Sequence, residues 1–439
     1  MHPLATAPGS ELSRPLRGRK PFLLFGQKLL DHLPLEKTKL VIPNTDSAPA
    51  RREFLRFAGL GALGVMLPRV SFARVLGGKR TGELLVYVGT YTTGKSEGIY
   101  LYRLNLSSGD LKQVATTSGV VNPSFLCLAL DRKYLYAVNE VQEFAGQKSG
   151  AVSAFAVDQK TGALRLLNQQ PSLGADPCYV DVDARGKFVL IANYTGGNVT
   201  VFPVRSDGSL GAPTDMKQGR GSSVNRERQE GPHAHCIVLD PGNRFAYSCD
   251  LGADKIMIFR FDARNGKLLP AETPWVQVKP GTGPRHLTFH PSGRYVFVLN
   301  ELHSTVTVFA RDPEKGSLKE LQTLATVPRD FTGPNTGADI HVSPDGRFLY
   351  GSNRGHDSIA IFAINPHGGL TAVGHESTRG RTPRNFAIDP SGAFLLVANQ
   401  KSDNIVVFRI DQRTGRLSST GQIAEVPSPV CLKFTSPFS

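Results

Sequence analysis

The stretch GPRHLTFHPSGRYVFVLNE, residues 283–301, has an arginine near its start and a glutamate at its end. Two short apolar segments around a Pro-Ser-Gly turn are typical of a β-hairpin. Arg285 would open the first strand and Glu301 would close the second, so antiparallel pairing would bring them together. A guanidinium there can hold a carboxylate or phosphate or stabilise an oxyanion, and a carboxylate can serve as a general base. The alternative is that the two residues only form an ion pair.

This hairpin is one copy of an internal repeat. Aligned copies begin at Pro123, Pro177, Ala234, Pro284, Gly337, Pro383 and, in truncated form, Pro429, so that successive starts lie 46 to 57 residues apart. Each complete copy is followed by a third apolar run that ends near a phenylalanine, then by a weaker fourth strand. Four short strands in a period of about 50 residues predict a β-propeller blade.

The two ends of the repeat region complement each other. The seventh copy stops after its first strand, and the missing three strands are predicted upstream, at residues 84–92, 98–105 and 110–117. The sequence therefore predicts an all-β fold, a seven-bladed β-propeller over residues 80–439, whose last blade combines N-terminal strands with a C-terminal strand. Such closure leaves no long sheet edge exposed. A sandwich or solenoid is the alternative, but neither needs complementary ends.

Columns of the aligned repeat differ in how much they vary. Position sixteen, counted from each start as zero, is Asn139, Asn193, Asp250, Asn300, Asn353 and Asn399. Position one is Ser124, Cys178, His235, Arg285, Ala338 and Arg384, and position seventeen is Glu140, Tyr194, Leu251, Glu301, Arg354 and Gln400. The recurrent Asn/Asp column predicts a structural role in binding backbone groups. The two variable columns meet at one mouth of the channel and predict a functional site there.

The remaining histidines and arginines have plainer interpretations. His233 and His235 form an H-x-H pair, but no third ligand follows at a comparable position, so we expect no metal. His286 and His290 are expected to make ordinary contacts on the other side of the strand or at the turn, and His341 to pack between blades. A long loop, residues 218–231, enters the same mouth, and its Arg220, Arg226 and Arg228 are either solvated or collect an anionic substrate.

Charge and cysteine usage exclude several function classes. The formal net charge of +14 is spread through turns, with no basic helix and no run of Lys/Arg, so we expect no nucleic-acid partner. The five cysteines are odd in number and contain no C-x-x-C, which indicates neither a disulfide framework nor a zinc site. We expect no cofactor, and these patterns leave the oligomeric state open.

The N-terminal region resembles an export signal. After a leader of residues 1–50, residues 51–73 carry Arg51 and Arg52, an apolar run over 57–67 and a Ser-Phe-Ala cleavage site at 71–73. This is typical of a twin-arginine signal peptide, although such signals normally begin near the first residue. We therefore expect a periplasmic or secreted protein with no stable membrane anchor after cleavage. The alternative is a short buried helix beside a chance Arg pair in a cytoplasmic protein.

Three strings, GPRHLTFHPSGRYVFVLNE, GPHAH and GADIHVSPDGRFLYGSNRGHDSIAIF, resemble the seven-bladed lactonase family over about residues 83–439. That family includes propeller-type 6-phosphogluconolactonases and fungal carboxy-muconate cyclases. The resemblance implies a catalytic His, Arg and Glu, which fall on His235, Arg285 and Glu301, and a further Arg at Arg354 or Arg384. We expect the substrate-binding residues to be Arg354, Arg384, Glu140 and Asn300.

The resemblance implies hydrolysis of a small anionic lactone or a related organic acid. Arg285 would stabilise the oxyanion or hold a substrate anion, and Glu301 or His235 would act as general base. An exported enzyme does not suit a cytosolic sugar-phosphate pathway, so another aldonolactone or an organic-acid lactone is a possible substrate. A muconate-type cycloisomerase and a non-catalytic binding propeller are the alternatives. No G-x-S-x-G occurs, so a serine-hydrolase route is unsupported.

Overall fold

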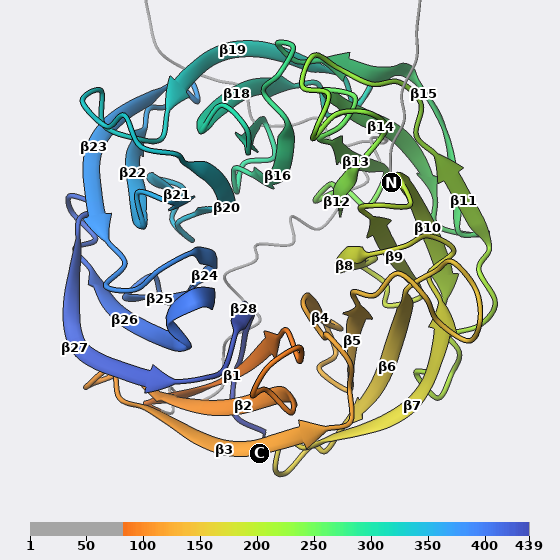
Figure 1. Cartoon of the computed structure of the whole chain (residues 1–439), viewed down its shortest axis with the longest axis horizontal. Helices are drawn as coiled ribbons and strands as arrows, with labels where there is room; N and C mark the ends of the chain where they lie inside the picture. The colour runs from red at the N-terminus through yellow and green to blue at the C-terminus, as the bar shows by residue number, and fades with distance from the viewer. Residues whose placement is uncertain (1–81, 439) are drawn as a thin grey trace, which may run out of the picture. The chain divides into compact units, whose positions relative to one another are not determined.

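The computed structural model describes residues 82–438, and the predicted leader and signal peptide lie outside them. The described residues form seven four-stranded antiparallel sheets, arranged as blades around a central channel (Figure 1). The seven-bladed propeller predicted from the repeat is confirmed. Among residues 82–438, no helix is long and apolar enough to cross a membrane.

Each blade is built from four strands in order from the channel outwards. The first strands are β4 (Leu126–Leu128), β8 (Pro177–Val182), β12 (Ala234–Leu239), β16 (Pro284–Phe289), β20 (Thr336–Val342), β24 (Pro383–Ile388) and β28 (Pro429–Thr435). The second strands are β5 (Tyr134–Asn139), β9 (Phe188–Asn193), β13 (Phe245–Asp250), β17 (Tyr295–Asn300), β21 (Phe348–Arg354), β25 (Phe394–Asn399) and β1 (Glu83–Thr90).

The third strands are β6 (Ala151–Val157), β10 (Asn198–Pro203), β14 (Lys255–Asp262), β18 (Thr305–Arg311), β22 (Ser358–Ile364), β26 (Asn404–Ile410) and β2 (Gly98–Asn105). The outer strands are β7 (Leu164–Pro171), β11 (Asp215–Gln218), β15 (Lys267–Gln277), β19 (Leu318–Ala325), β23 (Leu370–Ser377), β27 (Leu417–Glu425) and β3 (Leu111–Ser118). A 3-10 turn, η2 (Gln400–Ser402), follows β25.

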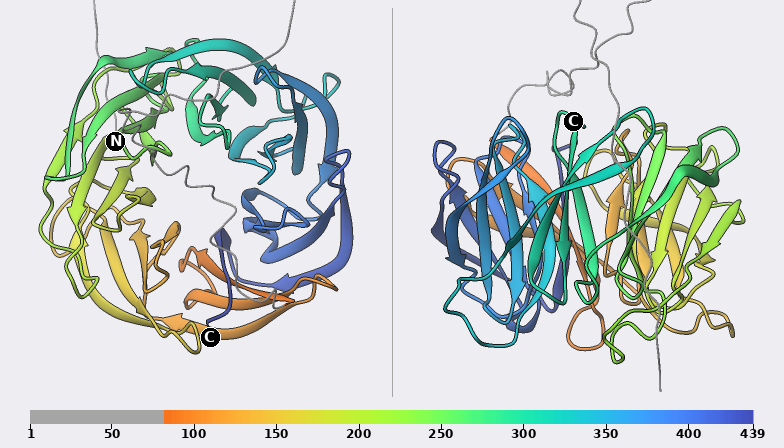
Figure 2. Two further views of the ribbon diagram at one scale, coloured as in Figure 1. Left: turned by 180° about the vertical axis from the view of Figure 1, so that it is seen from behind. Right: turned by 90° about the horizontal axis from the view of Figure 1, so that it is seen from above.

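The ring closes where its two ends share a sheet. The C-terminal strand β28 pairs antiparallel with β1, and Val86 lies opposite Phe434. The sheet order β28-β1-β2-β3 confirms the predicted composite blade, in which the orange N-terminal strands lie beside the blue C-terminal strand (Figure 1). Seen from the side, the blades stand next to one another with their strands running between the two faces of the ring (Figure 2).

The core lies between neighbouring blades. In one cluster, Tyr247 and Ile258 of one blade pack with Val298 and Phe309 of the next, and all four side chains are fully buried. β-Branched and aromatic residues favour such pleated surfaces. Burial of each large apolar side chain contributes about 1.5–3 kcal/mol, so the contact between blades is a major source of stability.

The recurrent Asn column serves the scaffold, as predicted. Asn353 donates from Nδ2 to the carbonyl of Thr326 at 2.5 Å, and Asn399 donates to the carbonyl of Thr378 at 3.1 Å. Both acceptors come directly after the outer strand of the preceding blade. The amide therefore fixes the segment that leads from one blade to the next.

Candidate active site

A β-bulge lies at the start of the first strand in several blades. In β16, Pro284 pairs with Asn300 and His286 pairs with Leu299, so Arg285 is an extra residue in the ladder. The same irregularity brackets Cys178, His235 and Arg384. A bulge bends the strand and redirects side chains. Positions one and two of the repeat can therefore both face the site.

Glu301 lies at the centre of three arginines. Its Oε2 is 2.9 Å from Arg285 Nε and 2.9 Å from Arg354 Nη2, and its Oε1 is 2.7 Å from Arg228 Nη2. Glu301 and Arg285 are only 4% and 2% exposed. Burial by itself would raise the pKa of Glu301, but Arg354, Arg285 and Arg228 outweigh it and lower this pKa to about 2. The carboxylate is ionised at neutral pH and both of its oxygens are engaged.

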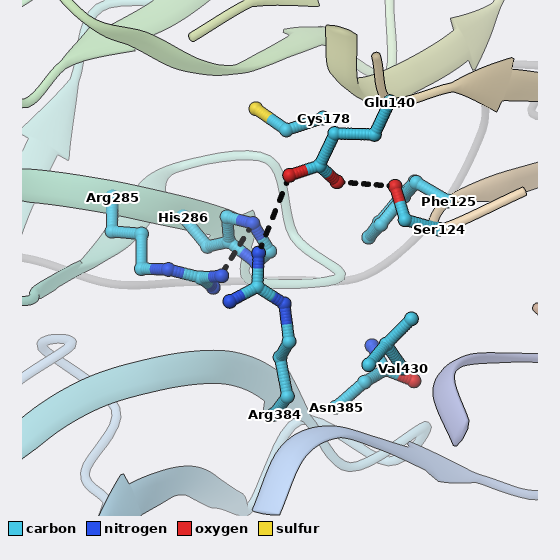
Figure 3. A pocket seen from close by; sticks show the side chains of 9 residues that line it. All are labelled: Ser124, Phe125, Glu140, Cys178, Arg285, His286, Arg384, Asn385 and Val430. Atoms are coloured by element: carbon cyan, nitrogen blue, oxygen red, sulfur yellow. Dashed lines mark hydrogen bonds and ion pairs between the residues drawn. The ribbon is translucent and has the colours of Figure 1, made fainter. Parts of the chain in front are cut away.

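Next to this cluster lies a small cavity. Its lining residues are Ser124, Phe125, Glu140, Cys178, Arg285, His286, Arg384, Asn385 and Val430 (Figure 3). They come from the first two strands of several blades and from the segments beside them. Three of the predicted site residues, Arg285, Arg384 and Glu140, line this cavity.

Glu140 and Arg384 form the second charged group of the site. Glu140 Oε1 accepts a 2.8 Å hydrogen bond from the Tyr91 hydroxyl, and its Oε2 accepts one from Ser124 Oγ. Arg384 Nη2 is 3.8 Å from Glu140 Oε1, and its guanidinium lies over the Tyr91 ring. Burial lowers the pKa of Arg384, but Tyr91, Glu140 and Glu301 more than reverse this and raise it above its usual value. Arg384 therefore remains a cation inside the cavity wall.

His235 contacts Cys178 of the cavity wall but is not itself among the lining residues. Its Nδ1 is 3.7 Å from Cys178 Sγ, and its ring meets the edges of the Tyr194 and His286 rings at centroid distances of 5.3 and 5.2 Å. Burial and the neighbouring Arg285 hold the pKa of His235 well below its usual range. The imidazole is neutral at physiological pH.

The loop over residues 218–231 places one of its arginines, Arg228, next to Glu301. Arg228 Nη2 contacts both Glu301 and the Tyr194 hydroxyl, the latter at 3.2 Å, whereas Arg220 and Arg226 are exposed. Gln229 is fully buried and donates to the carbonyl of Leu251 at 2.9 Å, which fixes the loop. Of the two interpretations left open by the sequence, the position of Arg228 favours a part in the site.

Asn300 and His233 do not join this arrangement. Asn300, expected to bind substrate, donates to Thr305 Oγ1 and Thr307 Oγ1 at 3.0 and 2.9 Å, as a member of the structural column. His233 binds Glu230 and the carbonyl of Tyr194. No group of three His, Cys, Asp or Glu within residues 82–438 is arranged to hold a metal ion.

The sequence interpretation missed His286. It was expected to make ordinary contacts, but the structure places it in the cavity wall, with Nε2 3.2 Å from Arg285 Nη1 and Nδ1 2.8 Å from Asp339 Oδ1. By contrast, His290 contacts Ser292 and Gly346 at the turn, and His341 packs against Phe386 of the next blade, both as expected. A signal for His286 was present, because position two of the repeat also varies. That column reads Phe125, Tyr179, Cys236, His286, Asp339 and Asn385.

The site combines cations with uncharged imidazoles. Arg228, Arg285, Arg354 and Arg384 face two carboxylates at the mouth, those of Glu301 and Glu140. The excess of guanidinium groups suits an anionic ligand, or an oxyanion that forms during a reaction. The neutral imidazoles can accept a proton.

Comparisons with known proteins give one consistent result. Residues 85–434 match the family described as "Lactonase, 7-bladed beta-propeller". The chain is 40% identical to the 6-phosphogluconolactonase of Bacillus subtilis (strain 168) over 349 residues, which are 79% of this chain and 97% of that protein. The structure of the periplasmic gluconolactonase of Pseudomonas aeruginosa superimposes with a TM-score of 0.77 at 37% identity, covering 81% of this chain and 99% of that one.

Proposed function

Since the chain belongs to the seven-bladed β-propeller lactonase family, we propose that it hydrolyses the lactone of a sugar acid in the cavity beside Arg285. The protein is a 6-phosphogluconolactonase-like carboxylic-ester hydrolase. The observation that carries this assignment is the pair of guanidiniums, the buried Arg285 and the partly exposed Arg384, in the wall of one small cavity next to an imidazole.

The geometry supports different roles for the arginines and for Glu301 during ring opening. Water attacks the lactone carbonyl, and negative charge develops on its oxygen. Arg285 and Arg384 are placed to stabilise that charge or to hold an anionic group of the substrate, since a guanidinium binds oxyanions through a planar fork. Glu301, with a pKa of about 2, is a weak base. We assign it the role of orienting three arginines.

The test compares lactones that differ in charge and connectivity. The purified protein is assayed with 6-phosphogluconolactone, gluconolactone and carboxymuconolactone, next to Arg285→Ala and Glu301→Gln. We expect turnover of at least one sugar-acid lactone and a large loss of kcat/KM in both variants. Arg244→Ala is the control, because Arg244 pairs with Glu314 on the exposed surface. Turnover no faster than background for all three lactones would remove the assignment, and turnover of carboxymuconolactone alone would favour the cycloisomerase alternative.

The same proposal includes export of the protein. Arg51 and Arg52 precede an apolar run and a small-residue cleavage site, and a relative at 37% identity is described as periplasmic. A reporter fused to residues 1–80 is expected to leave the cytoplasm, and replacement of both arginines by lysine is expected to retain it there. Equal export of the two fusions would contradict a twin-arginine route.

A further inference from the structure

A hydrogen-bonded group of side chains includes two residues of the cavity wall, His286 and Asn385. His286 Nδ1 lies 2.8 Å from Asp339 Oδ1, and His341 Nε2 lies 2.9 Å from Asp339 Oδ2. Asn385 Nδ2 also donates to Asp339 Oδ2, and Asn385 Oδ1 accepts from the Leu432 amide at 2.8 Å. These residues lie on β16, β20, β24 and β28, so four consecutive blades fix the position of one carboxylate.

The surroundings of Asp339 determine where the proton on His286 lies. Burial would raise the pKa of Asp339, but the two histidines outweigh it and hold this pKa well below its usual range. An ionised carboxylate only accepts hydrogen bonds, so His286 carries its hydrogen on Nδ1. The lone pair is then on Nε2, where it accepts a 3.2 Å hydrogen bond from Arg285 Nη1 in the cavity wall.

We propose that His286 is a further catalytic residue, the general base that activates water, and that Asp339 is its positioning residue. This inference rests on the proposed lactonase function. Nε2 takes a proton from water while the water oxygen bonds to the carbonyl carbon, and the carbonyl electron pair moves to the oxygen, which Arg285 stabilises. When the intermediate collapses, the ring C–O bond breaks and the proton passes from Nε2 to the ring oxygen. The product is the open hydroxy acid, and His286 is neutral again.

The other candidate bases are less suitably placed. Glu301 is not among the residues that line the cavity, and three guanidiniums bind its two oxygens. His235 is not among the residues that line the cavity, and its Nδ1 faces the thiol of Cys178 in place of a carboxylate. General-base catalysis needs a base that is held in one tautomer and one orientation. The Asp339 carboxylate holds His286 in this way.

An anionic substrate would increase the basicity of His286. Burial and Arg285 lower the pKa of His286 to about 3, against the opposing effect of Asp339. The polar and charged groups around its ring are Arg285 on β16, Asp339 and His341 on β20, His235 on β12 and Tyr179 on β8. A substrate anion bound to Arg285 offsets the main nearby cation, so the imidazole becomes a better base when substrate is present.

The first test replaces His286 with alanine and adds imidazole. General-base catalysis contributes about 10²–10⁴-fold, so we expect kcat to fall by about that factor with little change in KM, and added imidazole to restore part of it. His290→Ala is the matched control, because His290 contacts Ser292 and Gly346 at the turn of the same hairpin and does not line the cavity. It is expected to keep kcat near the parent value. Parent-like kcat in His286→Ala, or a loss in a folded variant that imidazole does not restore, would overturn the role of His286.

The second test is Asp339→Asn, which keeps the shape of the side chain. The amide can donate to Nδ1 and so favours the tautomer with hydrogen on Nε2. We expect lower kcat, unchanged KM and a shifted acid limb in the pH profile of kcat. An unchanged profile would refute positioning by Asp339. If the parent protein turns over no lactone, the lactonase function is refuted and this inference with it. If the parent is active and only the expected effects of the variants are missing, this inference alone is refuted.

Discussion

Replacement of Glu301 by glutamine is expected to lower stability as well as activity. The carboxylate is 4% exposed and contacts Arg285, Arg354 and Arg228 at 2.7–2.9 Å. Glutamine fills nearly the same volume but carries no charge. The variant would therefore leave the buried guanidinium of Arg285 and the largely buried guanidinium of Arg354 without their shared counter-charge.

The size of the effect follows from the pKa of Glu301. This pKa falls from an ordinary 4.5 to about 2 in the folded protein, and at about 1.4 kcal/mol per pKa unit the shift corresponds to roughly 3 kcal/mol of stability. Removal of one partner from a buried ion pair generally costs about 3–5 kcal/mol, because it leaves the other charge uncompensated. With an unfolding entropy of about 0.7 kcal/mol/K for a domain of this size, Tm is expected to fall by about 4–7 °C.

The pH dependence has a definite sign. The folded-state pKa lies below the unfolded value, so the stabilisation is complete above about pH 4.5 and is lost as the pH falls towards 2. Thermal unfolding of the parent and Glu301→Gln is measured at pH 7 and pH 3, and less than half of the difference is expected to remain at pH 3. Glu314→Gln is the control, because Glu314 also pairs with an arginine but is 77% exposed. Equal midpoints at pH 7, or a difference that does not shrink at pH 3, would refute the reasoning.

Three further variants test other parts of the molecule. Arg384→Met is expected to raise KM about 10- to 100-fold for a phosphorylated lactone and less for gluconolactone, because a charge-assisted hydrogen bond contributes about 1.5–3 kcal/mol; equal changes for both substrates would contradict this. Arg228→Ala should change stability by less than about 1 kcal/mol, since its side chain is 39% exposed, and should reduce the salt dependence of KM. Asn353→Ala should lower the free energy of unfolding in urea by about 1–3 kcal/mol and leave kcat unchanged, because it only ties one blade to the next.

The sequence was sufficient for the fold because scaffold residues recur in it. The Asn column and the apolar runs repeat in every complete copy, and complementary ends predict the composite blade that pairs β28 with β1. Hairpin geometry also predicted the meeting of Arg285 and Glu301, which lie 2.9 Å apart. The sequence left the choice between Arg354 and Arg384 open. In the structure, Arg354 pairs with Glu301, whereas Arg384 pairs with Glu140.

The sequence interpretation failed for His286 because regular strands alternate their side chains between two faces. That rule places neighbours such as Arg285 and His286 on opposite sides. The bulge between Pro284 and His286 breaks the alternation, and the apolar pattern of LTFHPSGRYVFVL does not reveal it. Electrostatic assignments were also beyond the pattern, since the pKa of Glu301 depends on Arg228 from a distant loop.

The bulges explain how this scaffold can hold a reactive site without losing its blades. A bulge leaves one residue unpaired in the first strand, and the rest of the ladder continues, as it does from His286 to Phe289. As a result, the side chains of two adjacent residues both reach the site. Position one supplies the cations Arg285 and Arg384, and position two supplies His286, Asp339 and Asn385. Because each position draws on different blades, substitutions in either column can alter the chemistry while the Asn column and the contacts between blades keep the ring intact.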